Sequence, residues 1–81
     1  MEKTKKTCPC CGCLTLEKDS MFDVCPVCFW EDDPLQSENE LYKGGANQVN
    51  LKIARINYLK IGAISEEFKT LTRKPLESEI P

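Results

Sequence analysis

The chain has 81 residues, of which 41% are hydrophobic and 30% are charged, and its formal net charge is −2. This composition excludes a disordered polypeptide and predicts one small domain. Because a domain of this size has a limited hydrophobic core, natural chains often add a metal ion or disulfides to stabilise it. The acidic balance disfavours a main role in binding nucleic acid or other phosphates.

Residues 1–6 are charged and polar, and no apolar run follows them. We expect this segment to be disordered, and we expect neither a signal peptide nor a segment that spans a membrane. The sequence therefore predicts a cytoplasmic protein without membrane contact. Reducing conditions in that compartment favour metal thiolates over disulfides among the six cysteines.

Two cysteine pairs with C-x-x-C spacing together form the pattern C-x₂-C-x₁₃-C-x₂-C. The four residues are Cys8, Cys11, Cys25 and Cys28. The pattern is close to that of four-cysteine zinc sites, because a short turn presents both thiolates of a pair to one ion. A proline inside each pair stiffens the turn, and Gly12 after the first pair allows the positive φ that such turns often need. Phe29 stands in the corresponding place after the second pair, where we expect the backbone to run into a helical turn.

Cys10 and Cys13 also stand at C-x-x-C spacing and offer a second register for the first turn. The register of Cys8 and Cys11 is favoured, because it alone has the internal proline and the following glycine. Cys10 is then either a small half-buried side chain or a thiol beside the metal that contacts a ligand or takes part in redox chemistry. Cys13 is expected to be a bystander.

The sequence contains no histidine. This removes His-based acid–base catalysis, Cys–His nucleophiles and the usual ligand sets of catalytic zinc. Four sulfur ligands leave no coordination position for water or substrate, so we expect a structural site and do not expect an enzyme. The expected cofactor is one Zn²⁺ ion, with iron in the same tetrahedral geometry as the alternative.

Between the cysteine pairs, residues 14–16 and 21–24 alternate apolar and polar side chains and flank a turn-like segment. This pattern predicts a β-hairpin. Residues 25–33 are ambiguous, because a helix that starts there would be ended by Pro34 within about two turns. We expect residues 35–48 to form a loop.

The clearest helix begins after Asn50, which suits an N-cap, and ends at Gly62. Its apolar residues recur at i, i+3, i+7 and i+10, which are Leu51, Ala54, Tyr58 and Ile61. A second short helix is expected to follow Ser65, which would cap it. Residues 76–81 are expected to be a loose tail, so the sequence predicts a single zinc-binding domain over residues 7–75.

The aromatic residues Phe22, Phe29 and Trp30 lie next to the second cysteine pair. We expect them to pack around the metal rather than to stack on the bases of a nucleic acid. On the predicted helix, Ile53 and Ile56 lie away from the apolar stripe. They either pack under the acidic loop or form a small interaction patch, which would allow weak self-association.

The cysteine turns and the segments around them resemble a known family. The residues that carry the resemblance are Cys8-Pro-Cys-Cys-Gly, Phe22-Asp-Val-Cys-Pro-Val-Cys-Phe-Trp-Glu-Asp-Asp33, Gly44-Gly45-Ala-Asn and Ala54-Arg-x-Asn-Tyr58. Over residues 7–75 the chain resembles the bacterial cysteine-rich CPCC family, whose small members are expected to bind zinc. The resemblance supports the four cysteines of the two pairs as ligands, includes Cys10 in the motif, and places Cys13 where an aromatic residue is commoner.

We therefore expect a small α+β domain stabilised by metal, with a zinc-knuckle or ribbon-like β-hairpin, two Cys-Pro-x-Cys turns and a C-terminal helix. The expected function is a non-enzymatic module that binds another protein through the acidic residues 31–40 or through the helix face. A thiol-based redox or metal-responsive role for Cys10 is the first alternative. Nucleic-acid binding comes third and would depend on Lys52, Arg55, Lys60, Lys69, Arg73 and Lys74.

Overall fold

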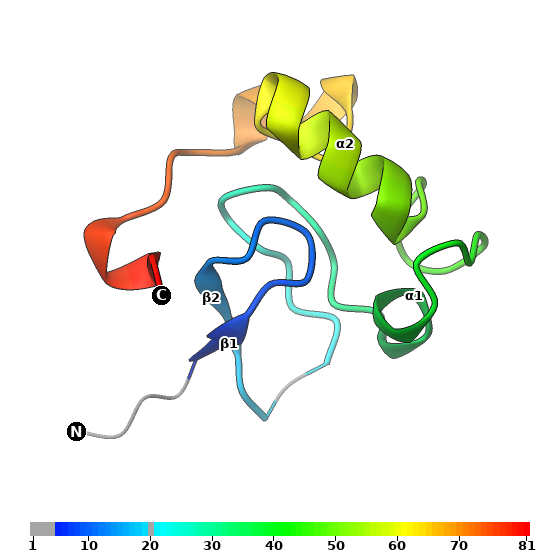
Figure 1. Ribbon diagram of the computed structural model, residues 1–81, viewed down its shortest axis with the longest axis horizontal. Helices are drawn as coiled ribbons and strands as arrows, with labels where there is room; N and C mark the ends of the chain where they lie inside the picture. The colour runs from blue at the N-terminus through cyan, green and yellow to red at the C-terminus, as the bar shows by residue number, and fades with distance from the viewer. Residues whose placement is uncertain (1–4, 20) are drawn as a thin grey trace.

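The computed structural model describes residues 5–19 and 21–81. Their elements are β1 (Lys5–Thr7), β2 (Leu14–Glu17), α1 (Pro34–Glu38), α2 (Leu51–Ile61) and the 3-10 helices η1 (Glu66–Leu71) and η2 (Glu77–Glu79). Figure 1 shows the loops of the first third of the chain in the middle of the molecule, with α2 along one side and α1 at one end. None of the described helices is long and apolar enough to cross a membrane.

β1 and β2 form an antiparallel hairpin that encloses the first cysteine pair. Lys6 pairs with Leu16, and the next residue of β1, Thr7, pairs with Leu14. Thr15 is therefore an extra residue in β2, and the strand carries a β-bulge there. Because the bulge interrupts the alternation of sides, Thr15 and Leu16 are both buried although they are neighbours.

The strand at residues 14–17 confirms the predicted strand, but its predicted partner is wrong. Residues 21–24 form no strand in the described part of the chain, and Val24 makes only an isolated bridge to Glu31. The reason is that each cysteine turn closes its own antiparallel pairing. β1 and β2 pair around the first turn, and the bridge closes the second.

The two ends of the chain differ from the loose segments that we expected there. Residues 5–6 belong to β1, whereas residues 1–4 lie outside the described residues. Within residues 76–81, Glu79 of η2 accepts two hydrogen bonds from the Arg73 guanidinium, both at 2.8 Å. Strand pairing therefore orders residues 5–6, and the ion pair orders part of residues 76–81, although the local sequence of neither segment predicts an ordered structure.

Pro34 begins a helix instead of ending one. The helix considered for residues 25–33 does not form, and α1 starts at Pro34 with Asp33 as its N-cap. The Asp33 carboxylate accepts a hydrogen bond from a backbone N–H of the first turn at 2.9 Å. Proline suits the first helical position because no partner is required there for its missing N–H. The prediction of a loop over residues 35–48 is therefore wrong for the residues of α1 and correct only for those that follow Glu38.

α2 confirms the predicted helix and both of its caps. Asn50 Oδ1 accepts a hydrogen bond from the first turn at 2.8 Å, and Gly62 ends the helix with φ 80°. Leu51 and Ala54 of the predicted stripe are buried. The short helix expected after Ser65 is the 3-10 helix η1, and the Ser65 side chain makes no capping hydrogen bond within the described chain.

Buried polar side chains hold the loop between α1 and α2. Gln36 is fully buried, donates through Nε2 to the Tyr42 carbonyl at 3.2 Å, and accepts from the Asn47 backbone N–H at 3.0 Å. Gly45 lies directly against this network. A Cβ at Gly45 would lie 2.5 Å from Asp33 Oδ2 and 2.7 Å from the Gln36 side chain, so packing requires a glycine there.

The hydrophobic core is built around cysteine sulfurs rather than around large aliphatic side chains. Its buried members are Cys8, Cys10, Cys13, Leu16, Cys25, Val27, Cys28, Trp30, Leu51, Ala54 and Ile64. α2 packs on this cluster through its buried stripe. The result is the predicted small α+β domain, with a hairpin, a helix and a four-cysteine cluster between them.

Candidate metal centre

The two cysteine turns have the same backbone geometry. In the first, Gly12 has φ 80° and its N–H donates to the Cys8 carbonyl at 2.8 Å. In the second, Phe29 has φ 73° and its N–H donates to the Cys25 carbonyl, also at 2.8 Å. The helical turn that we expected at Phe29 is therefore wrong, because the metal turn imposes the same left-handed residue at both places.

A left-handed conformation is strained for phenylalanine, because its Cβ lies too close to the following carbonyl oxygen. The strain energy is about 1–2 kcal/mol. The Phe29 ring stacks on the ring of Phe68 in η1, with 4.4 Å between the centroids and 23° between the planes. Aromatic pairs of this kind contribute about 0.5–1.5 kcal/mol beyond the area that they bury. The stacking thus offsets a strain that glycine would avoid.

The second cysteine turn also anchors the segment that follows α2. The Ile64 N–H donates to the Cys28 carbonyl at 3.0 Å, and the Arg73 N–H donates to the Pro26 carbonyl at 3.2 Å. Together with the stacked ring of Phe68, these contacts fix both ends of residues 64–73 on one turn. The position of this C-terminal segment therefore depends on the shape of the turn.

The structure brings the four predicted ligands into one cluster. The Sγ atoms of Cys8, Cys11, Cys25 and Cys28 all lie within 4.8 Å of one another. Sγ of Cys8 lies 3.6 Å from that of Cys28, and Sγ of Cys11 lies 3.7 Å from that of Cys25. A regular tetrahedron with metal–sulfur bonds of 2.3 Å has sulfur–sulfur edges of about 3.8 Å. Both of these distances match that edge and are far longer than a disulfide bond, which measures about 2.05 Å.

Thr15 supports the cluster from the bulge in β2. Its hydroxyl donates a hydrogen bond to Cys25 Sγ at 2.9 Å, and both residues are buried. The sequence analysis missed this residue, because strict alternation places Thr15 on the side of the strand opposite to Leu14 and Leu16. Bulges re-aim side chains in this way, but the sequence of β2 carries no signal for one.

The four thiols of the cluster differ in their pKa values. Hydrogen bonds from the Cys11 and Cys28 thiols, together with that from Thr15, hold the pKa of Cys25 well below its ordinary value. The pKa of each of the other three thiols is raised, that of Cys11 chiefly because it is hydrogen-bonded to Cys25. The folded cluster therefore favours a single thiolate, and a bound cation is needed before all four sulfurs can be ionised.

The cluster is largely shielded from solvent. Cys8, Cys25 and Cys28 are buried, Cys11 is half-buried, and Tyr58 of α2 packs against the same core. Burial, with a smaller contribution from the nearby thiolates, raises the pKa of Tyr58 to about 12. A shielded set of four sulfurs within 4.8 Å of one another can hold one metal ion with all of its ligands supplied by the protein.

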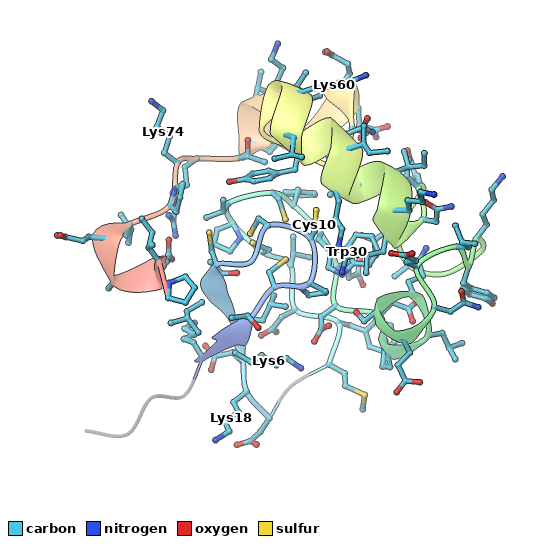
Figure 2. All side chains as sticks on the ribbon, viewed as in Figure 1. Lys6, Cys10, Lys18, Trp30, Lys60 and Lys74 are labelled. Atoms are coloured by element: carbon cyan, nitrogen blue, oxygen red, sulfur yellow. The ribbon has the colours of Figure 1, made fainter. Side chains whose placement is uncertain are left out.

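Cys10 and Cys13 are outside the four-sulfur cluster but inside the core. Cys13 is buried, and its thiol makes a long contact of 4.0 Å from Sγ to the Cys11 carbonyl. Cys10 is 8% exposed, and a hydrogen bond with its thiol is the largest cause that raises the pKa of Cys28. Figure 2 shows Cys10 among the sulfurs below α2, with Trp30 beside them. Cys10 thus lies next to a ligand.

Of the three aromatic residues expected around the metal, two have that place. Trp30 is fully buried in the core, and Phe29 stacks on η1 beside the second turn. Phe22 differs from the expectation, because its side chain is 49% exposed and its φ is 64°. Its backbone N–H donates to the Asp32 carbonyl at 2.9 Å, which fixes the chain direction while the ring points outward.

Much of the charge singled out in the sequence is used inside the fold. Asp32 is buried and pairs with Lys6 at 2.7 Å, and Asp33 is buried as the cap of α1. Among the basic residues, Arg55 pairs with Glu40 at 2.9 Å. The Arg73 guanidinium is likewise held in its ion pair with η2.

The comparison with known proteins agrees with the geometry of the site. The family model described as Cysteine-rich CPCC matches residues 6–79, which include all six cysteines and extend beyond the predicted boundary at residue 75 into η2. No curated protein matches the sequence.

Proposed function

We propose, from the premise that the chain belongs to the cysteine-rich CPCC family, that it is a domain built around one structural zinc ion and that it acts by binding another protein. The observation that carries the proposal is the cluster of four cysteine sulfurs within 4.8 Å of one another. Without an ion, the cluster holds most of its sulfurs as protonated thiols, because the pKa values of Cys8, Cys11 and Cys28 are raised. With an ion, it joins the two turns on which α2 and the C-terminal segment pack.

Zinc is the proposed metal because it accepts four thiolates in a tetrahedron and closed sites of this kind are structural. Iron accepts the same ligands, so elemental analysis must identify the ion. The chain is purified without added metal and examined by elemental analysis and native mass spectrometry. One zinc per chain supports the proposal, whereas one iron per chain or no metal contradicts it.

The structural role is tested by removing the ion and one ligand. A strong chelator should abolish the dispersed NMR spectrum of the folded chain, and adding zinc back should restore it. Cys8→Ala should lose both zinc and fold, whereas the matched variant Cys13→Ala should keep one zinc per chain, since Cys13 lies outside the cluster. A chain that stays folded after chelation, or a Cys8→Ala variant that does so, contradicts the structural role.

A non-enzymatic role is part of the proposal. Four protein ligands leave no position for a substrate on the metal, and the chain has no histidine to act as a general base. A cavity of about 330 Å³ lies between the end of α2 and residues 72–75, but none of the four cysteines lines it. All six cysteines are free thiols, which suits a reducing compartment such as the cytoplasm.

A redox role for Cys10 is the second candidate, and the contact between Cys10 and Cys28 favours it. In that case a peroxide would oxidise the two thiols to a disulfide and be reduced to water, and the loss of one ligand would release the ion. Peroxide should then release zinc from the parent chain much faster than from Cys10→Ala. If Cys10→Ala has the same zinc affinity and the same release rate as the parent chain, this candidate is excluded.

A further inference from the structure

α2 presents three apolar side chains to solvent on the side opposite the core. Ile53 is 43% exposed, Ile56 is 41% exposed and Leu59 is 84% exposed. At 100° per residue these side chains lie within an arc of about 120° on the helix surface. The sequence pattern indicated the two isoleucines but not Leu59, which is the most exposed large apolar side chain in the described part of the chain.

The same side of α2 is basic. Lys52, Arg55 and Lys60 alternate with the apolar residues, and the helix from Leu51 to Ile61 contains no acidic residue. Arg55 is paired with Glu40, but no ion pair involves Lys52 or Lys60 among the described residues. Figure 2 shows Lys60 on the side of α2 away from the cysteine loops. We call these six residues, 52, 53, 55, 56, 59 and 60, the outer face of α2.

The acidic segment of residues 31–40 is the other surface considered for a partner, and most of its carboxylates already interact within the fold. Asp32 and Asp33 are both buried. Asp32 forms an ion pair with Lys6, and Asp33 is the N-cap of α1. The carboxylate of Glu40 is held by Arg55. The outer face of α2 combines exposed apolar side chains with the charges of Lys52 and Lys60, which no described residue pairs.

We propose that the outer face of α2 binds an amphipathic helix of a partner protein in which acidic residues flank an apolar stripe. The inference rests on the proposed protein-binding function and specifies its partner. The apolar side chains supply buried area, and Lys52 and Lys60 supply charge that only an acidic partner complements. An 11-residue helix is about 16 Å long, so the contact spans about three turns of the partner helix.

Two observations argue against the other occupants of such a face. In a symmetric pair of α2 helices the basic residues of both copies would meet, and α2 supplies no acidic residue to pair with them, which is unfavourable. Against a membrane, the outer face lacks the Trp and Phe residues that helices lying in a membrane interface often use.

The test uses the zinc-loaded full chain and a synthetic helical peptide with an apolar stripe flanked by glutamates. A matched peptide carries lysine at each glutamate position. Binding is followed by NMR chemical-shift titration at low and high salt. We expect shifts confined to the outer face of α2, binding that weakens with salt, and no binding of the lysine peptide. Ile56→Asp should weaken binding by about tenfold or more, whereas Leu71→Asp, an equally drastic change at an exposed residue of η1, should not.

Four results of the titration overturn the inference. They are no shifts at about 1 mM peptide, equal binding of both peptides, shifts that map to other residues, and concentration-dependent shifts of the outer face without peptide, which indicate a second copy. Co-sedimentation of the chain with anionic vesicles, lost in Ile56→Asp, also overturns it in favour of a membrane. The proposed function is tested separately in the same samples. A folded spectrum that persists after chelation refutes the structural zinc, whereas a zinc-dependent fold that ignores the peptide refutes only the inference.

Discussion

Replacing Thr15 by valine removes one hydroxyl from the side of the sulfur cluster while leaving a side chain of nearly the same shape. The hydroxyl donates to Cys25 Sγ at 2.9 Å in a buried position, and it contributes to the lowered pKa of Cys25. Valine also suits a strand, so the β-bulge should survive the change. The variant therefore isolates the contribution of one hydrogen bond to a metal ligand.

The size of the effect follows from the kind of hydrogen bond. A hydrogen bond to a charged group contributes about 1.5–3 kcal/mol when the partner is buried, and tenfold in a dissociation constant corresponds to about 1.4 kcal/mol. Loss of such an outer partner of a metal ligand typically weakens metal binding by about 10- to 100-fold. We therefore expect Thr15→Val to weaken zinc binding by that factor and to keep a folded, zinc-loaded structure at saturating metal.

The assay is competition for zinc with a chromophoric chelator of known affinity at neutral pH. Thr70→Val is the matched control, because Thr70 is an exposed threonine of η1 and does not belong to the cluster. The control should bind zinc as tightly as the parent chain. A zinc affinity of Thr15→Val within twofold of the parent would refute the reasoning, since it would mean that the Cys25 sulfur does not depend on this donor.

Three further predictions concern packing, backbone strain and protons. Gly45→Ala should lower the free energy of unfolding of the zinc-loaded chain by about 1–3 kcal/mol in urea, because its Cβ would meet Asp33 and Gln36, and an unchanged midpoint would contradict this. Phe29→Gly and Phe29→Ala should both be less stable than the parent, but the glycine variant should be the more stable of the two by about 1 kcal/mol, and the reverse order would exclude strain at φ 73°. Zinc affinity should rise with pH, because raised pKa values keep three of the thiols protonated until the ion displaces their protons. Calorimetry in two buffers should detect release of about three to four protons per ion near neutral pH, and release of one or fewer would contradict it.

The sequence predicted those features that depend on residues close together in the chain. The clustering of four cysteines that could hold a metal ion follows from their spacing, and the limits of α2 follow from Asn50 and Gly62. α1 could also have been found, because Asp33 before Pro34 is the usual pattern of an N-cap followed by proline at the first helical position. The alternation of residues 21–24 misled, because a short amphipathic pattern does not identify its partner strand.

The features that escaped prediction depend on contacts between distant residues. Phe29 adopts a left-handed conformation because the metal turn requires it and Phe68 supports the ring. Gln36 is buried because Asn47 and the surrounding carbonyls satisfy its amide, which its position in a polar segment does not indicate. The direction of Thr15 depends on the bulge. None of these has a local sequence signal.

The attachment of residues 64–73 to the second cysteine turn has a consequence for the lifetime of the chain. Both anchoring carbonyls belong to the turn that the ion would hold, and the stacked ring of Phe29 extends from the same turn. If the ion leaves, the turn can relax and the last part of the chain loses its attachment first. Exposed, unfolded ends are preferred sites of proteolysis. Degradation would then discriminate between loaded and empty chains, and the supply of metal would determine how much of the protein a cell retains.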